Sequence, residues 1–240
     1  GCDYNCSFCT IPMARGKSRS DSISNVLANV EAIAGQGAKE IVLTGINLGD
    51  FRPPNPLKGE IANGLPAKKE NFLSLIKELD LVDGIERFRI SSIEPNLLTN
   101  DIIEFVSNSK KFMPHFHIPL QSGSDKILGL MRRRYKTDLY TERIGLIKTM
   151  MPHCCIGVDV IVGFPGETDE DFKATFDFLH QLDISYLHVF TYSERANTLA
   201  ATMKPVVPIH IRNERNKLLR NLSYQKMQYF TNAHIGETRK

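Results

Sequence analysis

The feature that most constrains the fold of this chain is a repeated alternation of two kinds of segment. Short apolar runs rich in β-branched residues are each followed by a polar loop and an amphipathic stretch with helical spacing. Strands that alternate with helices pair in parallel through right-handed crossovers, so the pattern predicts an α/β protein. Strands are expected at residues 40–43, 88–91, 115–120, 156–162 and 186–191, and helices at residues 23–34, 72–81, 100–107, 138–150 and 169–182.

The composition agrees with a globular chain of one domain. The 240 residues are 42% hydrophobic and 24% charged, which excludes disorder and a small disulfide scaffold. No apolar run approaches the roughly 18 to 20 residues that a membrane span needs, so no membrane partner is expected. In the fourth strand, Val158, Val160 and Val162 alternate with other residues, among them Asp159. This pattern suits a barrel strand with one polar residue facing a cavity.

Two segments depart from the alternation. Residues 51–69 hold four prolines and two glycines, which predicts a surface loop or insertion. A final helix is expected from residue 209 to about 229, with Ile211, Leu218, Leu222 and Tyr229 on its buried face. Residues 204–240 contain eight Lys or Arg and two Asp or Glu. We expect the basic residues of this helix on a solvated face; a guide for RNA and a hinge to another domain are the alternatives.

The five cysteines are unevenly placed. Cys2, Cys6 and Cys9 crowd the first nine residues, whereas Cys154 and Cys155 are adjacent. Neither arrangement suits a disulfide framework, so the pattern indicates a reducing compartment and metal or redox chemistry. We therefore expect a cytoplasmic protein. At least one of the adjacent pair is expected in the core, where a free cysteine is ordinary.

The three clustered cysteines have the spacing of a metal site. Cys2-x3-Cys6-x2-Cys9 places three thiolates on one short loop. Three soft ligands suit an iron–sulfur cluster and leave one of four irons without a protein ligand, free to bind a small chelating molecule. A three-cysteine zinc site and three idle buried thiols are the alternatives.

This spacing, with Phe8 immediately before Cys9, resembles the radical S-adenosylmethionine (SAM) superfamily. The resemblance implies that Cys2, Cys6 and Cys9 hold a 4Fe–4S cluster and that SAM binds its open iron, where an electron cleaves it to methionine and a 5′-deoxyadenosyl radical. It also implies a partial TIM barrel of the (β/α)6 type. The first strand of such a barrel precedes the first cysteine, so we expect it to be missing from these residues.

Motifs at the ends of the expected strands extend the resemblance to the SAM site. Thr44-Gly45-Ile46-Asn47 follows the first of these strands, and three successive arginines at 132–134 include one whose planar fork suits a carboxylate. The resemblance implies no catalytic residue beyond the cluster ligands. The SAM contacts it implies are Phe8, Thr44, Gly45, Asn47, Ser92, Glu94, Gln121, Ser122, Arg134, Asp159, Val162 and Gly163, and Tyr192 and Arg195 are candidate walls of the substrate cavity.

The segment at residues 157–168, which ends in Gly163-Phe-Pro-Gly-Glu-Thr168, narrows the resemblance to the methylthiotransferases. These enzymes insert a sulfur and a methyl group at C–H bonds of tRNA adenosines or of a ribosomal-protein aspartate. Residues 2–20 and 91–95 look most like the MtaB-type branch, which acts on threonylcarbamoyl-adenosine beside the tRNA anticodon. The RimO-type and MiaB-type branches are the alternatives. Arg15, Lys17 and Arg19 are positioned to meet the anionic RNA backbone, or to anchor the loop.

The resemblance also implies that several domains of a longer protein share the reaction. Residues 1–208 are expected to form the radical SAM core, and residues 209–240 a basic helix and the start of a linker to an RNA-binding TRAM domain. An N-terminal methylthiotransferase domain, which holds an auxiliary 4Fe–4S cluster in the family, and the TRAM domain are expected outside this chain. The chain is thus expected to cleave SAM, with electrons from a flavodoxin or ferredoxin, but not to complete thiomethylation alone. A non-catalytic metal-binding module is the alternative of another class.

Overall fold

In the part of the chain that the structure describes, five parallel strands follow one another across the molecule in chain order. The structure is a computed structural model that describes residues 1–53 and 70–238, so most of the loop expected at residues 51–69 lies outside the described residues. The strands are β1 (Glu40–Leu43), β2 (Arg87–Ile90), β3 (His115–His117), β4 (Cys155–Val162) and β5 (Tyr186–Thr191). β1 pairs with β2, and β3, β4 and β5 form a second sheet. Single bridges, Phe88 to Phe112 and Ser92 to His117, join the two sheets.

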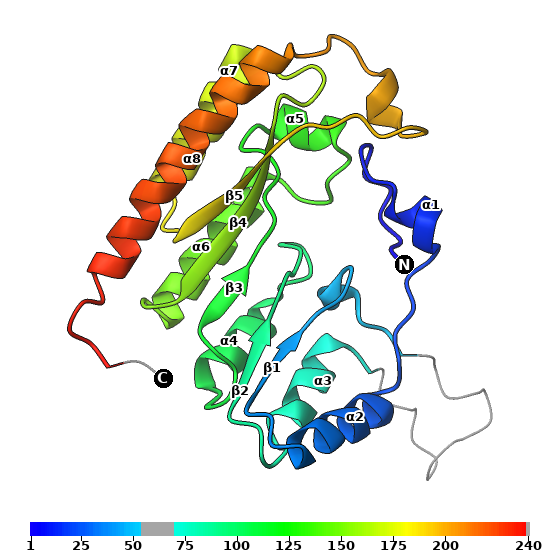
Figure 1. Ribbon diagram of the computed structural model, residues 1–240, viewed down its shortest axis with the longest axis vertical. Coiled ribbons are helices and arrows are strands. Elements are labelled where there is room, and N and C mark those ends of the chain that lie inside the picture. Colours follow the sequence, from blue (N-terminus) through cyan, green and yellow to red (C-terminus); the bar gives the residue numbers. More distant parts are fainter. Residues whose placement is uncertain (54–69, 239–240) are drawn as a thin grey trace.

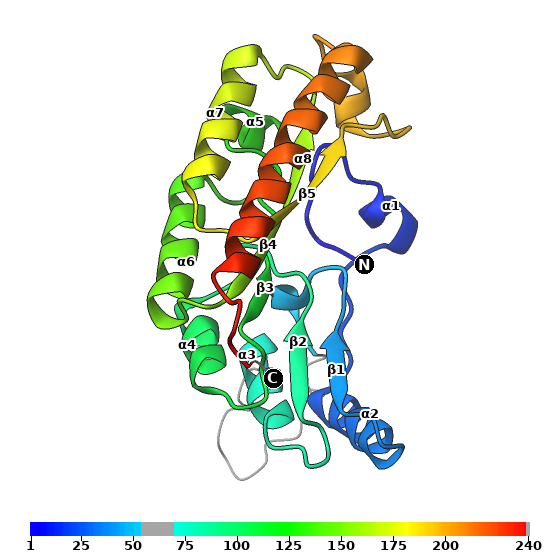
Figure 2. The same cartoon turned by 60° about the vertical axis from the view of Figure 1, so that its left-hand side comes forward.

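Helices cover one side of this curved array (Figures 1 and 2). The expected α/β alternation is confirmed, and α1 and α5 are additions that the sequence pattern did not predict. Among the helices that the structure describes, none is long and apolar enough to cross a membrane. The helices are α1 (Ile11–Arg15), α2 (Ile23–Gly35), α3 (Phe72–Leu79), α4 (Asn100–Asn108), α5 (Asp125–Leu130), α6 (Thr137–Met150), α7 (Asp169–Gln181) and α8 (Ile209–Asn232), with short 3-10 turns η1 (Leu48–Asp50) and η3 (Leu199–Thr202).

The period of two along the strands gives the sheet two different faces. In β4, Ile156, Val158, Val160 and Val162 are buried in the main core, where each side chain contributes about 1.5–3 kcal/mol. We call the opposite face the inner face. Most strand residues that lie on it are polar or ionisable, namely Glu40, Arg87, Arg89, His115, His117, Cys155, Asp159, Tyr186 and His188, although Val42, Gly157, Ile161 and Phe190 also lie on it. The expectation that Asp159 interrupts an apolar barrel strand on its cavity side agrees with this arrangement.

β3 is shorter than the strand expected at residues 115–120. It ends at His117, although the backbone N–H groups of Ile118 and Leu120 still donate to β4, to the carbonyls of Gly157 and Asp159 at 2.9 and 3.1 Å. Pro119 has no N–H with which to extend the ladder on the other side. The segment therefore runs along the sheet without being a regular strand, which leaves its end free to turn into α5.

The buried face of α8 differs from the expected one. α8 packs on β5 (Figure 2), and its buried residues are Arg212, Arg215, Leu219, Leu222 and Ser223. Leu218 and Tyr229, which were expected inside, are 50% and 77% exposed. The expectation holds for Leu222, which is 3% exposed, but it was wrong for Leu218 and Tyr229, because Arg212 and Arg215 occupy the buried face instead. Each pairs with carboxylates beyond the ends of β4 and β5: Arg212 with Glu194 in the loop after β5, and Arg215 with Glu167 in the loop after β4 and Asp169 at the start of α7.

Candidate metal centre

The three clustered cysteines lie on a loop at the carboxyl ends of the strands (Figure 1). We call residues 2–9 the cysteine loop. Ser7 is 3% exposed and fixes it from two sides. Its N–H donates to the Met131 carbonyl at 3.1 Å and its hydroxyl to the Leu130 carbonyl at 2.7 Å, while its own carbonyl accepts from the Ala200 N–H at 2.8 Å. The loop is thereby attached to the end of α5 and to η3, which is the end of a parallel barrel where cofactors bind.

Each cysteine sulfur of the loop accepts a hydrogen bond from nitrogen. The donors are the Tyr4 N–H to Cys2 Sγ at 3.4 Å, the Ile11 N–H to Cys9 Sγ at 3.4 Å and Arg133 Nη1 to Cys6 Sγ at 3.2 Å. All three thiols are free and partly buried. N–H donors to sulfur stabilise the negative charge of thiolate ligands and are a normal part of iron–sulfur sites. The donor set therefore fits a cluster.

The spacing of the three sulfurs favours a cluster over a single zinc ion. Two thiolates on one tetrahedral zinc lie about 3.8 Å apart, given Zn–S bonds of about 2.3 Å. Within the described residues, the His, Cys, Asp and Glu side chains whose ligand atoms all approach within 4.8 Å are His117, Asp159 and His188, not the three cysteines. A group several metal atoms wide can bridge thiolates that are farther apart than that.

Burial disfavours the thiolate forms of Cys2 and Cys6. It raises the pKa of Cys2 and of Cys6, and the negative charge on Cys9 raises both further. Arg133 acts in the opposite direction on Cys6. A bound cation offsets this cost, so metal binding at the loop is coupled to proton release.

Two cavities differ in their relation to the cysteine loop. A small pocket of about 170 Å³ opens beside Cys6 and Cys9 and is bounded by Arg132 and by residues 197–199. A larger one of about 1200 Å³ lies at the opposite ends of the strands, where Glu40, Arg87 and Cys155 begin β1, β2 and β4. Of these two cavities, the small one is the one lined by residues of the cysteine loop.

Arg133, rather than Arg134, is the arginine that reaches the cysteine loop from inside. The Arg133 side chain is 4% exposed and pairs with Glu94, whose side chain is 16% exposed. Arg134 lies on the surface, with its guanidinium 3.9 Å from the centre of the Tyr4 ring and Nη2 donating to the Asp3 carbonyl at 3.0 Å. Both arginines follow the turn after α5, in which Arg132 has a left-handed backbone with φ of 58°.

Arg133 is a cation surrounded by acceptors. Burial alone would lower its pKa, but Tyr135, Glu94 and Cys6 outweigh burial and raise it. Its Nε donates to the Tyr135 hydroxyl at 3.1 Å, and that hydroxyl is held by the Pro119 and Leu120 carbonyls at 2.8 and 2.9 Å. The carboxylate of Glu94 is thus committed to Arg133, which also donates to the sulfur of Cys6.

Amide side chains after β1 and β2 complete this end of the sheet. Both polar atoms of the Asn47 amide are buried and make no hydrogen bond of ordinary geometry with the described residues. Asn96 Nδ2 donates to the Tyr4 hydroxyl at 2.8 Å, which leaves its own Oδ1 without a partner in the described structure. Buried polar atoms of this kind require a partner. A small ligand with an amine and a carboxylate can supply one for Asn47, whose neighbours Thr44 and Gly45 are exposed.

Four other residues predicted from the sequence lie along the same end. Phe8 packs edge-on against Phe164 with ring centres 6.2 Å apart, in a small apolar cluster below the loop. Ser92 bridges to His117, and Gln121 adopts a φ of 72° beside Val160. Asp159 lies on the inner face, where its Oδ1 is 2.9 Å from Nε2 of His117.

Three predicted residues are tied to the scaffold by their own contacts. Ser122 is fully buried and its hydroxyl lies 3.2 Å from that of Thr175 on α7. The Val162 side chain is 1% exposed and belongs to the main core, so its backbone, rather than its side chain, lies towards the inner face. Gly163 has a φ of 75°, and a Cβ there would lie 2.3 Å from Cγ of Arg212. Only glycine suits that position.

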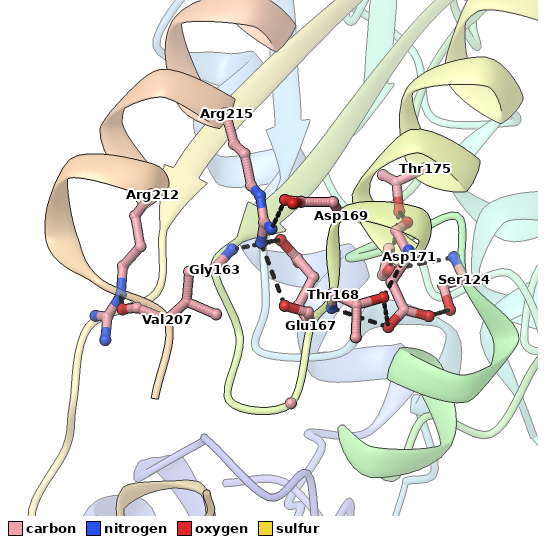
Figure 3. A network of polar contacts seen from close by, with 12 residues as sticks. Ser124, Gly163, Glu167, Thr168, Asp169, Asp171, Thr175, Val207, Arg212 and Arg215 are labelled. Atoms are coloured by element: carbon pink, nitrogen blue, oxygen red, sulfur yellow. Dashed lines mark hydrogen bonds and ion pairs between the residues drawn. The ribbon is translucent and has the colours of Figure 1, made fainter. Parts of the chain in front are cut away.

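A polar network holds the loop after β4 in one shape (Figure 3). Glu167 Oε1 accepts from the Gly163 N–H at 3.0 Å and from Arg215 at 2.5 Å. Burial raises the pKa of Glu167, an effect that the Gly163 N–H and Arg215 counteract. Thr168 and Asp171 form a capping box that starts α7. The loop between β4 and α7 is therefore a rigid wall beside the site.

The sequence reasoning missed several residues of this region. Arg133 could not be distinguished from its two neighbours by pattern, because only the turn after α5 decides which arginine points inward. No sequence motif or periodicity identified Tyr4 or Asn96 as residues of the site. His117 and His188 lie two strands apart, and only their alternation with buried residues in β3 and β5 could have placed them on one face.

Comparisons with known proteins agree with this geometry. The family model described as "Radical SAM superfamily" matches residues 1–179. Among solved structures, TsrM from Kitasatospora setae, a radical S-adenosylmethionine methyltransferase, aligns with a TM-score of 0.63 at 16% identity over 84% of this chain and 37% of its own. Coproporphyrinogen III oxidase (HemN) from Escherichia coli aligns with a TM-score of 0.60 at 14% identity over 97% of this chain and 50% of its own. At such identities the likeness shows the fold alone, and it agrees with the expected partial barrel.

Curated relatives are more similar in sequence. The chain is 39% identical to threonylcarbamoyladenosine tRNA methylthiotransferase MtaB of Aquifex aeolicus, over 99% of this chain and 55% of the relative, and 40% identical to that of Bacillus subtilis, over 99% and 50%. It is 36% identical to tRNA-2-methylthio-N(6)-dimethylallyladenosine synthase 1 of Mycobacterium marinum, over 100% of this chain and 46% of the relative. The chain thus spans about half the length of the curated relatives it matches.

Proposed function

Because this chain belongs to the radical SAM superfamily, we propose that it is the catalytic core of a methylthiotransferase that modifies threonylcarbamoyl-adenosine in tRNA near the anticodon. The observation that carries the proposal is the cysteine loop, three sulfurs with N–H donors at the carboxyl ends of parallel strands. Cys2, Cys6 and Cys9 are the proposed ligands of a 4Fe–4S cluster. A cluster bound there supplies the electron that cleaves SAM.

The residues around the loop are the proposed SAM contacts. The buried amide of Asn47, which makes no hydrogen bond of ordinary geometry, suits the amino group of SAM. Arg134 is the proposed partner of its carboxylate, because the nitrogens of Arg133 already donate to Tyr135, Cys6 and Glu94. Glu94 orients Arg133 and neutralises it. The remaining proposed contacts of the adenosyl portion are those at the ends of β2, β3 and β4: Phe8, Thr44, Gly45, Ser92, Gln121, Ser122, Asp159, Val162 and Gly163.

The choice of substrate rests on similarity. The relatives named for threonylcarbamoyladenosine are 39–40% identical, whereas those named for dimethylallyladenosine are 33–38% identical. Arg15, Lys17 and Arg19 are exposed just after the cysteine loop, where they can meet an RNA backbone. Dimethylallyladenosine tRNA is the second candidate substrate.

Methylthiolation needs components beyond these residues. The sulfur atom is proposed to come from an auxiliary 4Fe–4S cluster, for which this chain offers no second cysteine trio, only the pair Cys154 and Cys155. We further propose that residues 1–208 form the core, that residues 209–240 lead towards a TRAM domain, and that a flavodoxin or ferredoxin donates electrons. A tRNA substrate and reduced thiols both favour a cytoplasmic location.

Anaerobic reconstitution tests the cluster. With iron and sulfide, followed by reduction, the chain should give a 4Fe–4S electron paramagnetic resonance signal that SAM alters. Cys2→Ala, Cys6→Ala or Cys9→Ala should abolish the brown chromophore. Cys154→Ala is the matched control and should keep it, because Cys154 is fully buried in the main core. Equal losses in all four variants, or a signal indifferent to SAM, would leave a non-catalytic metal-binding module as the better description.

A second experiment tests the substrate. Mass spectrometry of tRNA nucleosides from cells that lack the full-length gene should show the loss of methylthio-threonylcarbamoyl-adenosine, with recovery on complementation. Loss of the dimethylallyl derivative instead would move the assignment to the second candidate. Unchanged tRNA, with loss of a methylthio group from a ribosomal protein, would place the enzyme with the protein-modifying branch.

A further inference from the structure

A second group of metal-ligand side chains lies on the inner face, separate from the cysteine loop. His117, Asp159 and His188 come from three neighbouring strands, β3, β4 and β5. One ligand atom of each lies within 4.8 Å of those of the other two. Neither histidine was identified from the sequence, and the proposed function does not use them.

Strand register brings these three residues together. Asp159 and His188 are direct partners in the parallel ladder of β4 and β5. His117 is opposite Gly157, one pleat earlier on β4, and its ring reaches forward so that Nε2 lies 2.9 Å from Asp159 Oδ1. The His117 and His188 rings are nearly perpendicular, with centres 5.4 Å apart. Tyr186 packs edge-on against His188 and limits the positions that its ring can take.

The distances agree with coordination of one ion. His117 Nε2 and Asp159 Oδ1 are hydrogen-bonded at 2.9 Å. Two ligands at right angles on a metal with bonds of about 2.1 Å are about 3.0 Å apart, so an ion can replace the proton between these two atoms with little movement of either side chain. The third ligand has to move inward. His188 is exposed and can do so by a side-chain rotation, whereas the side chains of His117 and Asp159 are 20% and 21% exposed and define the fixed pair.

The donor types select the kind of ion. Two imidazoles and one carboxylate on one side of an ion suit Fe²⁺, Zn²⁺ or Co²⁺ and leave further positions open. They do not suit Ca²⁺ or Mg²⁺, which prefer oxygen ligands. The cysteine loop, with three soft sulfurs, selects differently. The two groups therefore need not compete for the same metal.

We propose that His117, Asp159 and His188 form a binding site for a divalent transition-metal ion on the inner face, with open positions directed into the space that the sheet partly encloses. These positions can accept nitrogen or oxygen donors of a bound molecule. Coordination through Oδ1 leaves Oδ2 of Asp159 for the SAM contact proposed above.

Cobalt binding tests the site without interference from the cluster. The Cys2→Ala/Cys6→Ala/Cys9→Ala variant, stripped with a chelator, is titrated with Co²⁺ and followed by its visible d–d absorption and by equilibrium dialysis. We expect one Co²⁺ per chain, no thiolate charge-transfer band and displacement by Zn²⁺. His188→Ala and Asp159→Asn, added to this background, should each weaken binding by at least about tenfold. Because the cysteines are absent, the outcome is independent of the cluster assignment.

Controls separate this site from adventitious binding. His180→Ala removes an exposed histidine of α7 that is not part of the group, and it should leave the affinity for Co²⁺ unchanged. Circular dichroism confirms the fold of each variant, and Asp159→Asn keeps the size of the side chain if His188→Ala does not fold. Absence of Co²⁺ binding, retention of full affinity in both His188→Ala and Asp159→Asn, or loss in His180→Ala would overturn the proposal.

Discussion

Replacing Arg133 with methionine tests the central pair of the candidate site. The Arg133 side chain is 4% exposed and its partner Glu94 is 16% exposed, so the substitution leaves a mostly buried carboxylate without a cation. Removing one partner of such a pair costs about 3–5 kcal/mol. A buried carboxylate without a cation can instead take up a proton. For an ordinary glutamic acid this costs about 3.7 kcal/mol at pH 7, which sets an upper limit on the loss of stability. We expect Arg133→Met to lower the free energy of unfolding by about 3–4 kcal/mol.

A double-mutant cycle separates the ion pair from simple packing. Glu94→Gln in the Arg133→Met background removes the stranded charge, and the double variant should be about 2 kcal/mol more stable than the sum of the two single losses predicts. Urea unfolding of the metal-free chain, followed by circular dichroism, measures each value. In a thermal scan the single Arg133→Met loss corresponds to roughly 6–16 °C for a chain of this length.

Arg134→Met is the matched control. This arginine is exposed and contacts the Tyr4 ring from the surface, so its loss should cost less than about 1 kcal/mol. If Arg133→Met unfolds within 1 kcal/mol of the parent chain, or if the Arg133 and Glu94 effects simply add, the buried pair does not have the energy assigned to it.

Two further predictions concern the first turn of α7 and the loop between β4 and α7. Lys126 and several hydrogen bonds outweigh burial and lower the pKa of Asp171 to about 2, from 3.8, and its side chain is 11% exposed. A carboxyl group whose pKa is lower in the folded state stabilises that state above pH 3.8. Asp171→Asn should therefore lower the free energy of unfolding by about 2 kcal/mol at pH 7. In unfolding measured as a function of pH, the difference between the variant and the parent chain should vanish as the pH falls from 3.8 through 2. Gly163→Ala forces a Cβ against Arg212 in a left-handed position and should cost more than about 1 kcal/mol, whereas Gly129→Ala inside α5, with open space around it, should be neutral or stabilising; thermal unfolding that ranks them otherwise would contradict the clash.

The strands and most helices could be predicted from the sequence because their apolar periods match their burial. β4 and β5 begin and end within one residue of the expected positions, and the buried Cys154 is confirmed in the core. The short helices α1 and α5 could not be predicted in this way. α1 buries none of its residues, and α5 is too short for a helical period to stand out.

The site was only partly predictable, for a different reason. A loop with three cysteines is recognisable from spacing alone, since the ligands are neighbours in the chain. Arg133, Asn96 and His188 come together with distant residues, and their roles depend on turns and on register that composition does not encode. Likewise, the sequence predicted solvated side chains for Arg212 and Arg215, because their acidic partners Glu194, Glu167 and Asp169 are distant in the chain.

The two-faced sheet has a consequence for how this protein tolerates change. Along β4, Ile156, Val158 and Val160 hold the helices in place, while Cys155, Asp159 and Ile161 between them face the other side. We expect substitutions at the first set to lower the amount of folded protein in a cell, and substitutions at Asp159, a proposed SAM contact and metal ligand, to lower the activity of the folded protein. In a saturation scan that scores abundance and activity separately, substitutions at Val158 and Val160 should therefore lower abundance. Substitutions at Asp159, which lies between them, should lower activity at normal abundance.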